Sequence, residues 1–484
     1  MDQTSFGALG SGYWIRFYHI QARACTVAGF VGLLTGCLET ARVFTESSSD
    51  TKIGVRDSRY QKDFSVEAPD PGSPGPSFFT AEKPLVPLAS YSEEYWTAVA
   101  QLDLTALHAA ARSEPEIGFA EGIALLAAGA EEKAESTFVA MSRQAIDVNV
   151  AAASQMMLAT TLVYEHKWTT LRDLSSSTSL GPLDRGHTAD LGHWGHAFAS
   201  LDPPITTFPE KPVTLQLEVT DLGTPAVRVR INGREYEFWL DTGSSMTVLS
   251  SNVASDANVP ILSSDTLNIR TFQGTAPVRP GAVKRMEIGR TVFANVPAMV
   301  MDASLMRLRG DGEGIAGSGL RVDGIIGWDI IRQLDIVLDF QNRIVIIRRP
   351  ERRKRDGTTF QNLVWVGKPL VEVRTKPGGT LHFTLDTGAQ ASFLNAAILE
   401  RVGARTRASH ARVFGIAMTG GRTERVIPGL NVNVGGKQLR LEDVIIYGPS
   451  TSGLINCDGI LGSDIAHFGE IRIDATNGLF SIAD

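Results

Sequence analysis

Cysteine is scarce in this chain, with only Cys25, Cys37 and Cys457 among 484 residues. Three cysteines cannot form a framework of several disulfides, which excludes a small disulfide-stapled fold. Long apolar runs are also lacking, because no stretch reaches the roughly 18 residues that a membrane-spanning helix needs. We therefore expect no transmembrane helix.

An excess of basic residues is absent as well. The chain has 46 Lys and Arg against 53 Asp and Glu, a formal net charge of −7, which argues against a nucleic-acid-binding protein. Its nine histidines include no H-E-x-x-H pair, so a metalloprotease is not expected, and neither a metal nor a cofactor is predicted. Residues 312–317, GEGIAG, match G-x-G-x-x-G, but no strand precedes them and we expect a loop there.

The N-terminus carries a candidate export signal. Arg16 and Arg23 precede a short apolar stretch, ACTVAGFVGLL, that ends in Thr35-Gly36-Cys37. Its length fits the apolar core of a secretory signal. Leu34-Thr35-Gly36-Cys37 resembles the lipobox of bacterial lipoproteins, which implies a signal peptide over residues 1–36 and lipidation of Cys37. The protein would then sit in the bacterial cell envelope, lipid-anchored outside the cytoplasm; the alternative is a buried helix in a folded N-terminus.

Composition divides the rest of the chain into successive segments. Residues 37–83 are rich in Ser, Asp and Pro and predict a disordered tether. Residues 84–200 show helical periodicity, and from residue 211 onward short β-branched stretches broken by Gly or Asn predict an all-β region. We divide that region into a first lobe (211–350), a basic linker (351–359) and a second lobe (360–484).

Within the helical segment, one set of spacings resembles a tetratricopeptide repeat (TPR). Gly122 and Ala134 are small residues where two helices would cross, and Leu125 and Phe138 are bulky neighbours. A generic helical hairpin explains the pattern equally well. In either case we expect a spacer or docking module, which makes this segment a candidate binding surface for a protein partner.

Two stretches of the all-β region repeat each other. FWLDTGSSMTVLS begins at Phe238 and FTLDTGAQASFLN begins at Phe383, so each places Asp-Thr-Gly at the end of an apolar, strand-like run. Further on, DGIIGWDIIRQLDIVLDFQNRIVII (323–347) aligns without a gap on DGILGSDIAHFGEIRIDATNGLFSI (458–482). The region is therefore predicted to be a duplicated fold with two homologous lobes.

These motifs resemble those of aspartic proteases, specifically the retropepsin-like group. In that family each lobe carries an Asp-Thr/Ser-Gly loop, and an apolar-apolar-Gly segment passes beside it, as Ile325-Ile326-Gly327 and Ile460-Leu461-Gly462 would here. Both lobes occur in one chain, as in pepsin-like enzymes, which implies an intramolecular site and a monomeric protease domain. The implied architecture is multidomain: an all-β, bilobal acid-protease fold preceded by the small α-helical TPR-like module.

The chemistry of amide hydrolysis explains why the motif occurs twice. Without a metal or a covalent intermediate, the reaction needs an activated water and an acid for the leaving amine, and two carboxylates that share one proton supply both. Each lobe offers one such residue, so we predict Asp241 and Asp386 as the catalytic pair. The predicted supporting residues of the two loops are Thr242, Gly243, Ser244, Thr387, Gly388 and Ala389.

The supporting residues have separate expected roles. Gly243 and Gly388 allow the backbone to turn tightly beside the carboxylates. By the resemblance, Thr242 and Thr387 hydrogen-bond across the lobe interface and hold the two loops together.

The two loops differ at the next position. Ser244 is expected to donate its hydroxyl to the Asp241 carboxylate and to favour the charged form. Ala389 cannot do this for Asp386, so we expect Asp386 to be protonated more readily.

A mobile hairpin over the cleft is also expected of this family. Residues 269–277, IRTFQGTAP, and residues 412–421, RVFGIAMTGG, stand in the corresponding places. Phe272 and Phe414 are candidate flap residues that would cover the substrate and exclude water. Packing of both side chains in the core is the equally favoured alternative.

Two functions from different classes fit the sequence. The first is an aspartic endopeptidase that acts on a peptide or protein substrate from a membrane surface. The alternative is a catalytically silent peptide- or protein-binding module, whose helical segment recruits a partner. Retention of two mutually repelling carboxylates favours the enzyme, because a binder has no need of them.

Overall fold

The computed structural model describes residues 42–45, 93–143, 147–177, 187–220, 223–271, 274–308, 320–352, 361–414, 422–447 and 454–484. Outside these residues lie the predicted signal peptide with Cys37, most of the predicted tether, the 312–317 loop, most of the basic linker and Phe272. What the sequence predicts for those parts stays a prediction.

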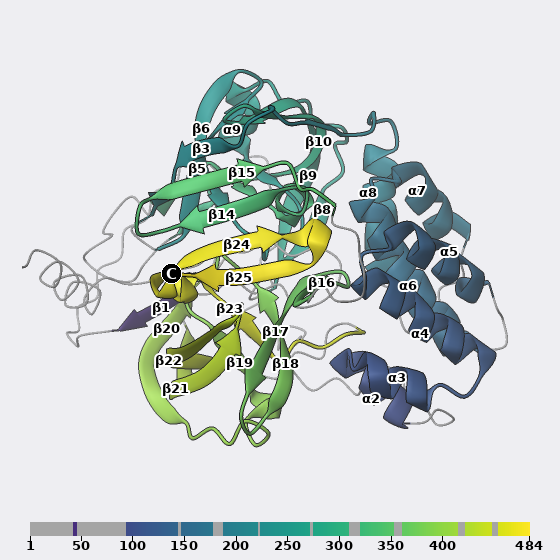
Figure 1. Cartoon of the computed structure of the whole chain (residues 1–484). Helices are drawn as coiled ribbons and strands as arrows, with labels where there is room; N and C mark the ends of the chain where they lie inside the picture. The colour runs from purple at the N-terminus through teal and green to yellow at the C-terminus, as the bar shows by residue number, and fades with distance from the viewer. Residues whose placement is uncertain are drawn as a thin grey trace, which may run out of the picture.

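A helical module precedes the β region and packs along one side of it (Figure 1). Ser113 starts helix α4 with a capping box: its hydroxyl accepts the Glu116 N–H at 3.3 Å, and the Glu116 carboxylate accepts the Ser113 N–H at 2.9 Å. Helix α6 is the central element, because it is buried along most of its length. The helices are α2 (Glu93–Gln101), α3 (Leu104–Ala110), α4 (Glu114–Ala127), α5 (Glu131–Ser142), α6 (Val148–Tyr164), α7 (Trp168–Ser177) and α8 (His187–Phe198).

The TPR-like spacing reflects close packing of α4 on α5. A Cβ atom on Gly122 would lie 2.6 Å from Cε1 of Phe138, so only glycine permits this approach. Ala134 and Phe138 are fully buried, and Leu125 packs at the edge of the core. The assignment to TPR repeats stays an interpretation. Within the described part of the chain, no helix is long and apolar enough to cross a membrane.

Lobe 1 is a closed mixed β-barrel. Its strands follow the order β10-β7-β13-β6-β5-β9, and β9 pairs with β10 to close the barrel. The β5–β6 hairpin turns at Asn232-Gly233, both with positive φ (50° and 89°), as a two-residue turn of type I′ requires. The elements are β2 (Ile205–Thr207), β4 (Glu218–Val219), β5 (Pro225–Ile231), β6 (Arg234–Leu240), β7 (Val248–Ser250), α9 (Ser251–Asp256), β8 (Leu267–Thr271), β9 (Gly274–Ile288), β10 (Thr291–Met301), β11 (Arg307–Leu308), β12 (Leu320–Arg321), β13 (Gly324–Ile326) and α10 (Trp328–Ile331).

Lobe 2 repeats this barrel. The order is β22-β19-β23-β18-β17-β21, closed by pairing of β21 with β22, so each strand has a counterpart in lobe 1. The duplication predicted from sequence therefore extends to strand order and direction. The elements are β1 (Arg42–Thr45), β16 (Leu363–Trp365), β17 (Pro369–Thr375), β18 (Gly379–Leu385), β19 (Phe393–Asn395), η2 (Ala396–Ile398), β20 (Arg407–Phe414), β21 (Arg422–Val434), β22 (Lys437–Tyr447), β23 (Gly459–Leu461) and η3 (Ser463–Phe468).

A separate five-stranded sheet joins the lobes. Its order is β25-β24-β14-β15-β3, and β14 of lobe 1 pairs antiparallel with β24 of lobe 2. Arg472 and Asp335 reinforce this junction with two hydrogen bonds of 2.8 and 2.9 Å. The elements are β3 (Val213–Gln216), β14 (Asp335–Asp339), β15 (Ile344–Arg348), β24 (Glu470–Asp474), η4 (Ala475–Asn477) and β25 (Leu479–Ala483). The predicted fold class, a bilobal all-β region preceded by a helical module, is confirmed.

Candidate active site

The two Asp-Thr-Gly loops lie at the ends of equivalent strands. β6 pairs in parallel with β13, and just past β6 the Asp241 N–H donates to the Ile326 carbonyl at 3.0 Å. β18 and β23 repeat this arrangement, with the Asp386 N–H donating to the Leu461 carbonyl at 3.0 Å. The apolar-apolar-Gly strand of each lobe thus passes beside the Asp-Thr-Gly loop of the same lobe.

The loops bring the two aspartates together across the lobe interface. The side chains of Asp241 and Asp386 share a hydrogen bond and are both buried. A Cβ atom on Gly243 would lie 2.4 Å from Cγ of Asp386, and one on Gly388 would lie 2.5 Å from Cγ of Asp241. Real Cβ atoms do not approach other atoms so closely, so each glycine is needed to admit the carboxyl group of the opposite lobe.

Thr242 and Thr387 form a reciprocal hydrogen-bonded pair beneath the aspartates. The Thr242 hydroxyl donates to the Leu385 carbonyl at 2.8 Å and accepts the Thr387 N–H at 3.0 Å. The Thr387 hydroxyl donates to the Leu240 carbonyl at 2.7 Å and accepts the Thr242 N–H at 3.1 Å. Every one of these bonds crosses between the lobes, so the pair fixes one loop relative to the other.

Backbone N–H groups hold the Asp241 carboxylate. Its Oδ1 accepts the Gly243 N–H at 2.9 Å and the Ser244 N–H at 3.1 Å, and the Gly388 N–H also donates to the carboxylate. Burial raises the pKa of Asp241 above its ordinary value, whereas the hydrogen bond with Asp386 and the N–H donors favour the charged form. Two carboxyl groups this close cannot both ionise without a cost in free energy, so their arrangement favours a state with one proton on the pair.

The expected contact of the Ser244 hydroxyl is wrong. This hydroxyl donates to the Met246 carbonyl at 2.8 Å, because a backbone acceptor two residues along the chain competes for it. The contact to Asp241 comes from the Ser244 backbone N–H, and the Ala389 N–H makes the same contact to Oδ1 of Asp386 at 2.9 Å. The side chains at these two positions therefore do not distinguish the aspartates.

Two further buried carboxyl groups support the loops, and neither was predicted as a site residue from the sequence. Asp329, in the first turn of α10, accepts the Thr247 hydroxyl at 3.1 Å. Asp464, in η3, accepts the hydroxyl and the N–H of Ser392 at 2.7 and 2.8 Å. Burial raises the pKa of Asp329 to about 7 and that of Asp464 to about 6. Their signal in the sequence was the Gly-x-Asp-Ile shared by the two aligned segments.

The candidate flaps are hairpins, one in each lobe. β8 pairs with β9, and β20 pairs with β21, both antiparallel. Phe272 lies outside the described residues, and Phe414 ends β20 with a side chain that the structure does not describe. The flap role of both residues stays a prediction.

The lobes differ at one buried position near the loops, which is Lys368 in lobe 2 and Thr224 in lobe 1. Lys368 lies in the turn between β16 and β17, is 2% exposed, and its Nζ has no hydrogen-bond partner among the described residues. The β17–β18 register starts at the pair Leu370 and Thr384, so Lys368 and Asp386 each lie two residues beyond it, at the same end of the two strands. In lobe 1 the β5–β6 register starts at Ala226 and Trp239, and the equivalent positions two residues beyond it are Thr224 and Asp241.

Cys457 is buried, with its Sγ 3.3 Å from the Tyr447 hydroxyl. Within the part of the chain that the structure describes, no group of three or more His, Cys, Asp and Glu residues is arranged to hold a metal ion.

Comparison with known proteins points to the same family as the loop motifs. Residues 227–330, which include Asp241 and Ile325-Ile326-Gly327, match the aspartyl protease family. A crystal structure of a retropepsin-like aspartic protease from Rickettsia conorii matches with 13% identity and a TM-score of 0.18, over 30% of this chain and 92% of that one. The comparison with curated proteins gives no match. The resemblance to aspartic proteases is therefore confirmed for residues 227–330, the segment that supplies the first Asp-Thr-Gly loop.

Proposed function

We propose that this chain is an aspartic endopeptidase that hydrolyses peptide bonds with a water activated between Asp241 and Asp386. One observation supports this most directly: each carboxyl group lies against the glycine of the opposite loop, at a point where a Cβ atom would come within about 2.5 Å. Such closeness costs free energy between two carboxyl groups unless one proton is shared. Hydrolysis uses that shared proton.

The proposed reaction divides the work between the two carboxyl groups. The ionised one removes a proton from water as the water oxygen attacks the carbonyl carbon of the substrate. The protonated one donates its hydrogen to the carbonyl oxygen, which becomes the hydroxyl of a tetrahedral diol. The carboxyl group that took the proton from water then donates it to the amide nitrogen, while the other carboxylate removes a proton from one diol hydroxyl. The C–N bond breaks, the products are an amine and a carboxylic acid, and one carboxyl group of the pair is again protonated. Throughout, Thr242 and Thr387 keep the two loops in register.

Peptide-library cleavage by the full chain tests this function. We expect hydrolysis at acidic to neutral pH and its loss, by at least 1000-fold, in Asp241→Asn. Asp443→Asn is a matched control, because Asp443 is exposed on β22 and its positive φ of 49° suits asparagine equally. If Asp241→Asn cleaves as fast as Asp443→Asn, the proposed function is wrong. If Asp241→Asn binds the library peptides and neither the wild type nor Asp443→Asn hydrolyses them, the chain is a peptide-binding module and not an enzyme.

We also propose that the enzyme is held on a bacterial membrane surface by a lipid on Cys37. The support is the sequence Leu34-Thr35-Gly36-Cys37 after a short apolar stretch. Cys37→Ser should release the protein from the membrane fraction of expressing cells. Cys25→Ser, inside the proposed signal peptide, should leave it there; equal membrane retention of both variants would refute the anchor.

A further inference from the structure

The helical module packs against both lobes and does not stand apart from them as a tether would (Figure 1). At the end of α2, the Ala100 carbonyl accepts the Asn456 N–H of lobe 2 at 2.8 Å, and the Gln101 backbone hydrogen-bonds His382. Helix α8 lies against β8 and β9, the candidate flap hairpin of lobe 1. The sequence pattern predicted a docking or spacer module. In the structure, the surface on which this module docks is formed by the two lobes of the same chain.

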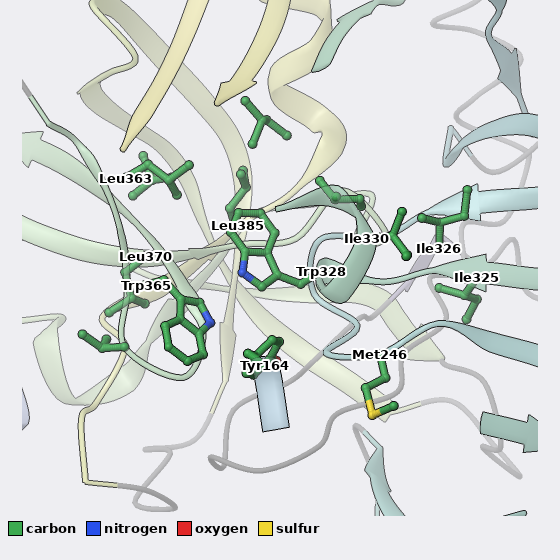
Figure 2. Packing of buried hydrophobic residues seen from close by; sticks show 14 of the residues in the cluster. Tyr164, Met246, Ile325, Ile326, Trp328, Ile330, Leu363, Trp365, Leu370 and Leu385 are labelled. Carbon is green, nitrogen blue, oxygen red and sulfur yellow. The ribbon is translucent and has the colours of Figure 1, made fainter. Parts of the chain in front are cut away.

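A second part of this interface is built around Tyr164, the last residue of α6. Its ring meets Trp365 of lobe 2 edge to face, with ring centroids 4.7 Å apart. The Arg332 guanidinium of lobe 1 lies over both rings, 5.5 Å from the Tyr164 centroid and 5.1 Å from that of Trp365. Figure 2 shows Tyr164 at this junction, near Trp365 and Trp328. One side chain of the helical module thus touches both lobes.

Arg332 connects this junction to the first Asp-Thr-Gly loop. It follows α10 directly, pairs with Glu131 of α5 and donates to the Tyr164 carbonyl at 3.5 Å. At the other end of α10, the Trp328 N–H donates to the Ser244 carbonyl at 2.6 Å. Helix α10 is therefore held by the helical module at one end and holds the loop at the other.

Tyr164 also reaches the loop itself. Its hydroxyl shares a hydrogen bond with the Ser245 side chain, and the Asp329 N–H donates to the Ser245 carbonyl at 3.3 Å. Ser245 is the neighbour of Ser244, whose N–H donates to the Asp241 carboxylate at 3.1 Å. The Tyr164 hydroxyl is therefore connected to the Asp241 carboxylate through a hydrogen bond to Ser245, the peptide unit between Ser245 and Ser244, and the hydrogen bond of the Ser244 N–H.

We propose that Tyr164 is a positioning residue for the hydrolytic reaction, through which the helical module holds the 241–246 loop and the N–H donors of Asp241 in place. This inference rests on the proposed function. It makes the helical module a third structural part of the active site, contributed by a segment about 80 residues away from Asp241 in the sequence. Tyr164 does not touch the substrate; it acts through Ser245.

Loss of the Tyr164 hydroxyl should lower kcat without abolishing it, and it should shift the pH–rate profile in a known direction. A typical buried hydrogen bond is worth about 1 kcal/mol, so we expect kcat to fall about 5- to 10-fold with KM unchanged. The Gly243 and Ser244 N–H groups favour the charged form of Asp241. When they are held less firmly, the pKa of Asp241 rises, so the acid limb of the pH–rate profile should move to higher pH.

The test compares Tyr164→Phe with Tyr236→Phe in the full chain. Both changes remove one hydroxyl and keep the ring; Tyr164→Phe retains the contacts with Trp365 and Arg332, and Tyr236 bonds Asp256 at 2.5 Å on the surface of lobe 1. We would measure kcat, KM, the pH–rate profile and amide hydrogen exchange of peptides covering residues 238–250. Ser245→Ala and the double variant Tyr164→Phe/Ser245→Ala complete a double-mutant cycle.

The expected result is slower turnover, a shifted acid limb and faster exchange in residues 241–246 for Tyr164→Phe, and none of these for Tyr236→Phe. Ser245→Ala should reproduce the loss, and the double variant should add little to it, because both remove the same bond. Unchanged kinetics and unchanged exchange in Tyr164→Phe would overturn the proposal, as would fully additive losses. Should the wild-type chain hydrolyse no peptide, the proposed function fails, and the exchange rates alone decide whether Tyr164 holds the loop.

Discussion

The threonine pair permits a quantitative prediction, because each hydroxyl both donates and accepts across the lobe interface. Thr387→Val keeps the shape of the side chain and removes two of the four bonds, leaving the Leu240 carbonyl and the Thr242 N–H without partners. Both groups belong to buried residues, and an unsatisfied buried polar group costs about 1–3 kcal/mol. We therefore expect Thr387→Val to lower the free energy of unfolding by roughly 2–6 kcal/mol.

Urea denaturation of the full chain, followed by fluorescence, measures this loss as a lower midpoint at constant slope. Thr387→Ser is the control, because it keeps the hydroxyl and loses only a methyl group; we expect it to lose about 1 kcal/mol. Turnover by Thr387→Val should also fall, since the loops are no longer fixed relative to each other. Equal midpoints for the Val and Ser variants would refute the reasoning and would show that the two crossing bonds contribute little to stability.

Four further predictions follow from single contacts. Ser244→Ala should leave the acid limb of the pH–rate profile unchanged, because its hydroxyl bonds the Met246 carbonyl; a limb shifted by half a pH unit would contradict the contact. Gly243→Ala should abolish turnover, since its Cβ would lie 2.4 Å from Cγ of Asp386, and residual activity above about 10% would contradict that geometry. Burial raises the pKa of Asp329 to about 7, so the folded protein binds this proton more tightly than the unfolded chain, and the free energy of unfolding falls as pH rises from about 4 to 7. In Asp329→Asn, melting temperatures measured over this pH range should fall less than in the wild type. A fall of the same size would contradict the burial of the Asp329 carboxyl group. Lys368 is buried at the end of β17–β18 where the Asp386 loop begins; Lys368→Met should therefore move the acid limb to higher pH, and a shift to lower pH would contradict an influence of Lys368 on the pair.

Sequence alone was sufficient for the parts of the site that are duplicated. A single Asp-Thr-Gly says little, but two copies followed by two aligned segments of equal spacing specify matched strands, and the strands then bring Asp241 and Asp386 to one interface. The glycines follow from the same logic, because the approach of the opposite carboxyl group leaves no room for a Cβ atom. The duplicated motifs were therefore enough to predict both the bilobal fold and the meeting of Asp241 with Asp386.

Contacts that depend on side-chain rotation or on docking between segments were not predictable. The Ser244 hydroxyl had two acceptors within reach, and the choice of the Met246 carbonyl is made by local geometry that the residue types do not encode. Tyr164 belongs to a faint second TPR-like spacing, but nothing in the sequence indicated a role at the site, because its partners lie in other domains. The N-terminal predictions, including Cys37, lie outside the described residues and stay predictions.

The proposed site takes its second carboxyl group from lobe 2, beyond the segment that matches the aspartyl protease family. The most direct measurement is kcat/KM of the full-length Asp386→Asn variant on a peptide that the wild type cleaves, beside Asp443→Asn. We expect a loss of at least 1000-fold for Asp386→Asn and wild-type rates for Asp443→Asn. Hydrolysis by Asp386→Asn at a rate close to that of the control would contradict the two-lobe site.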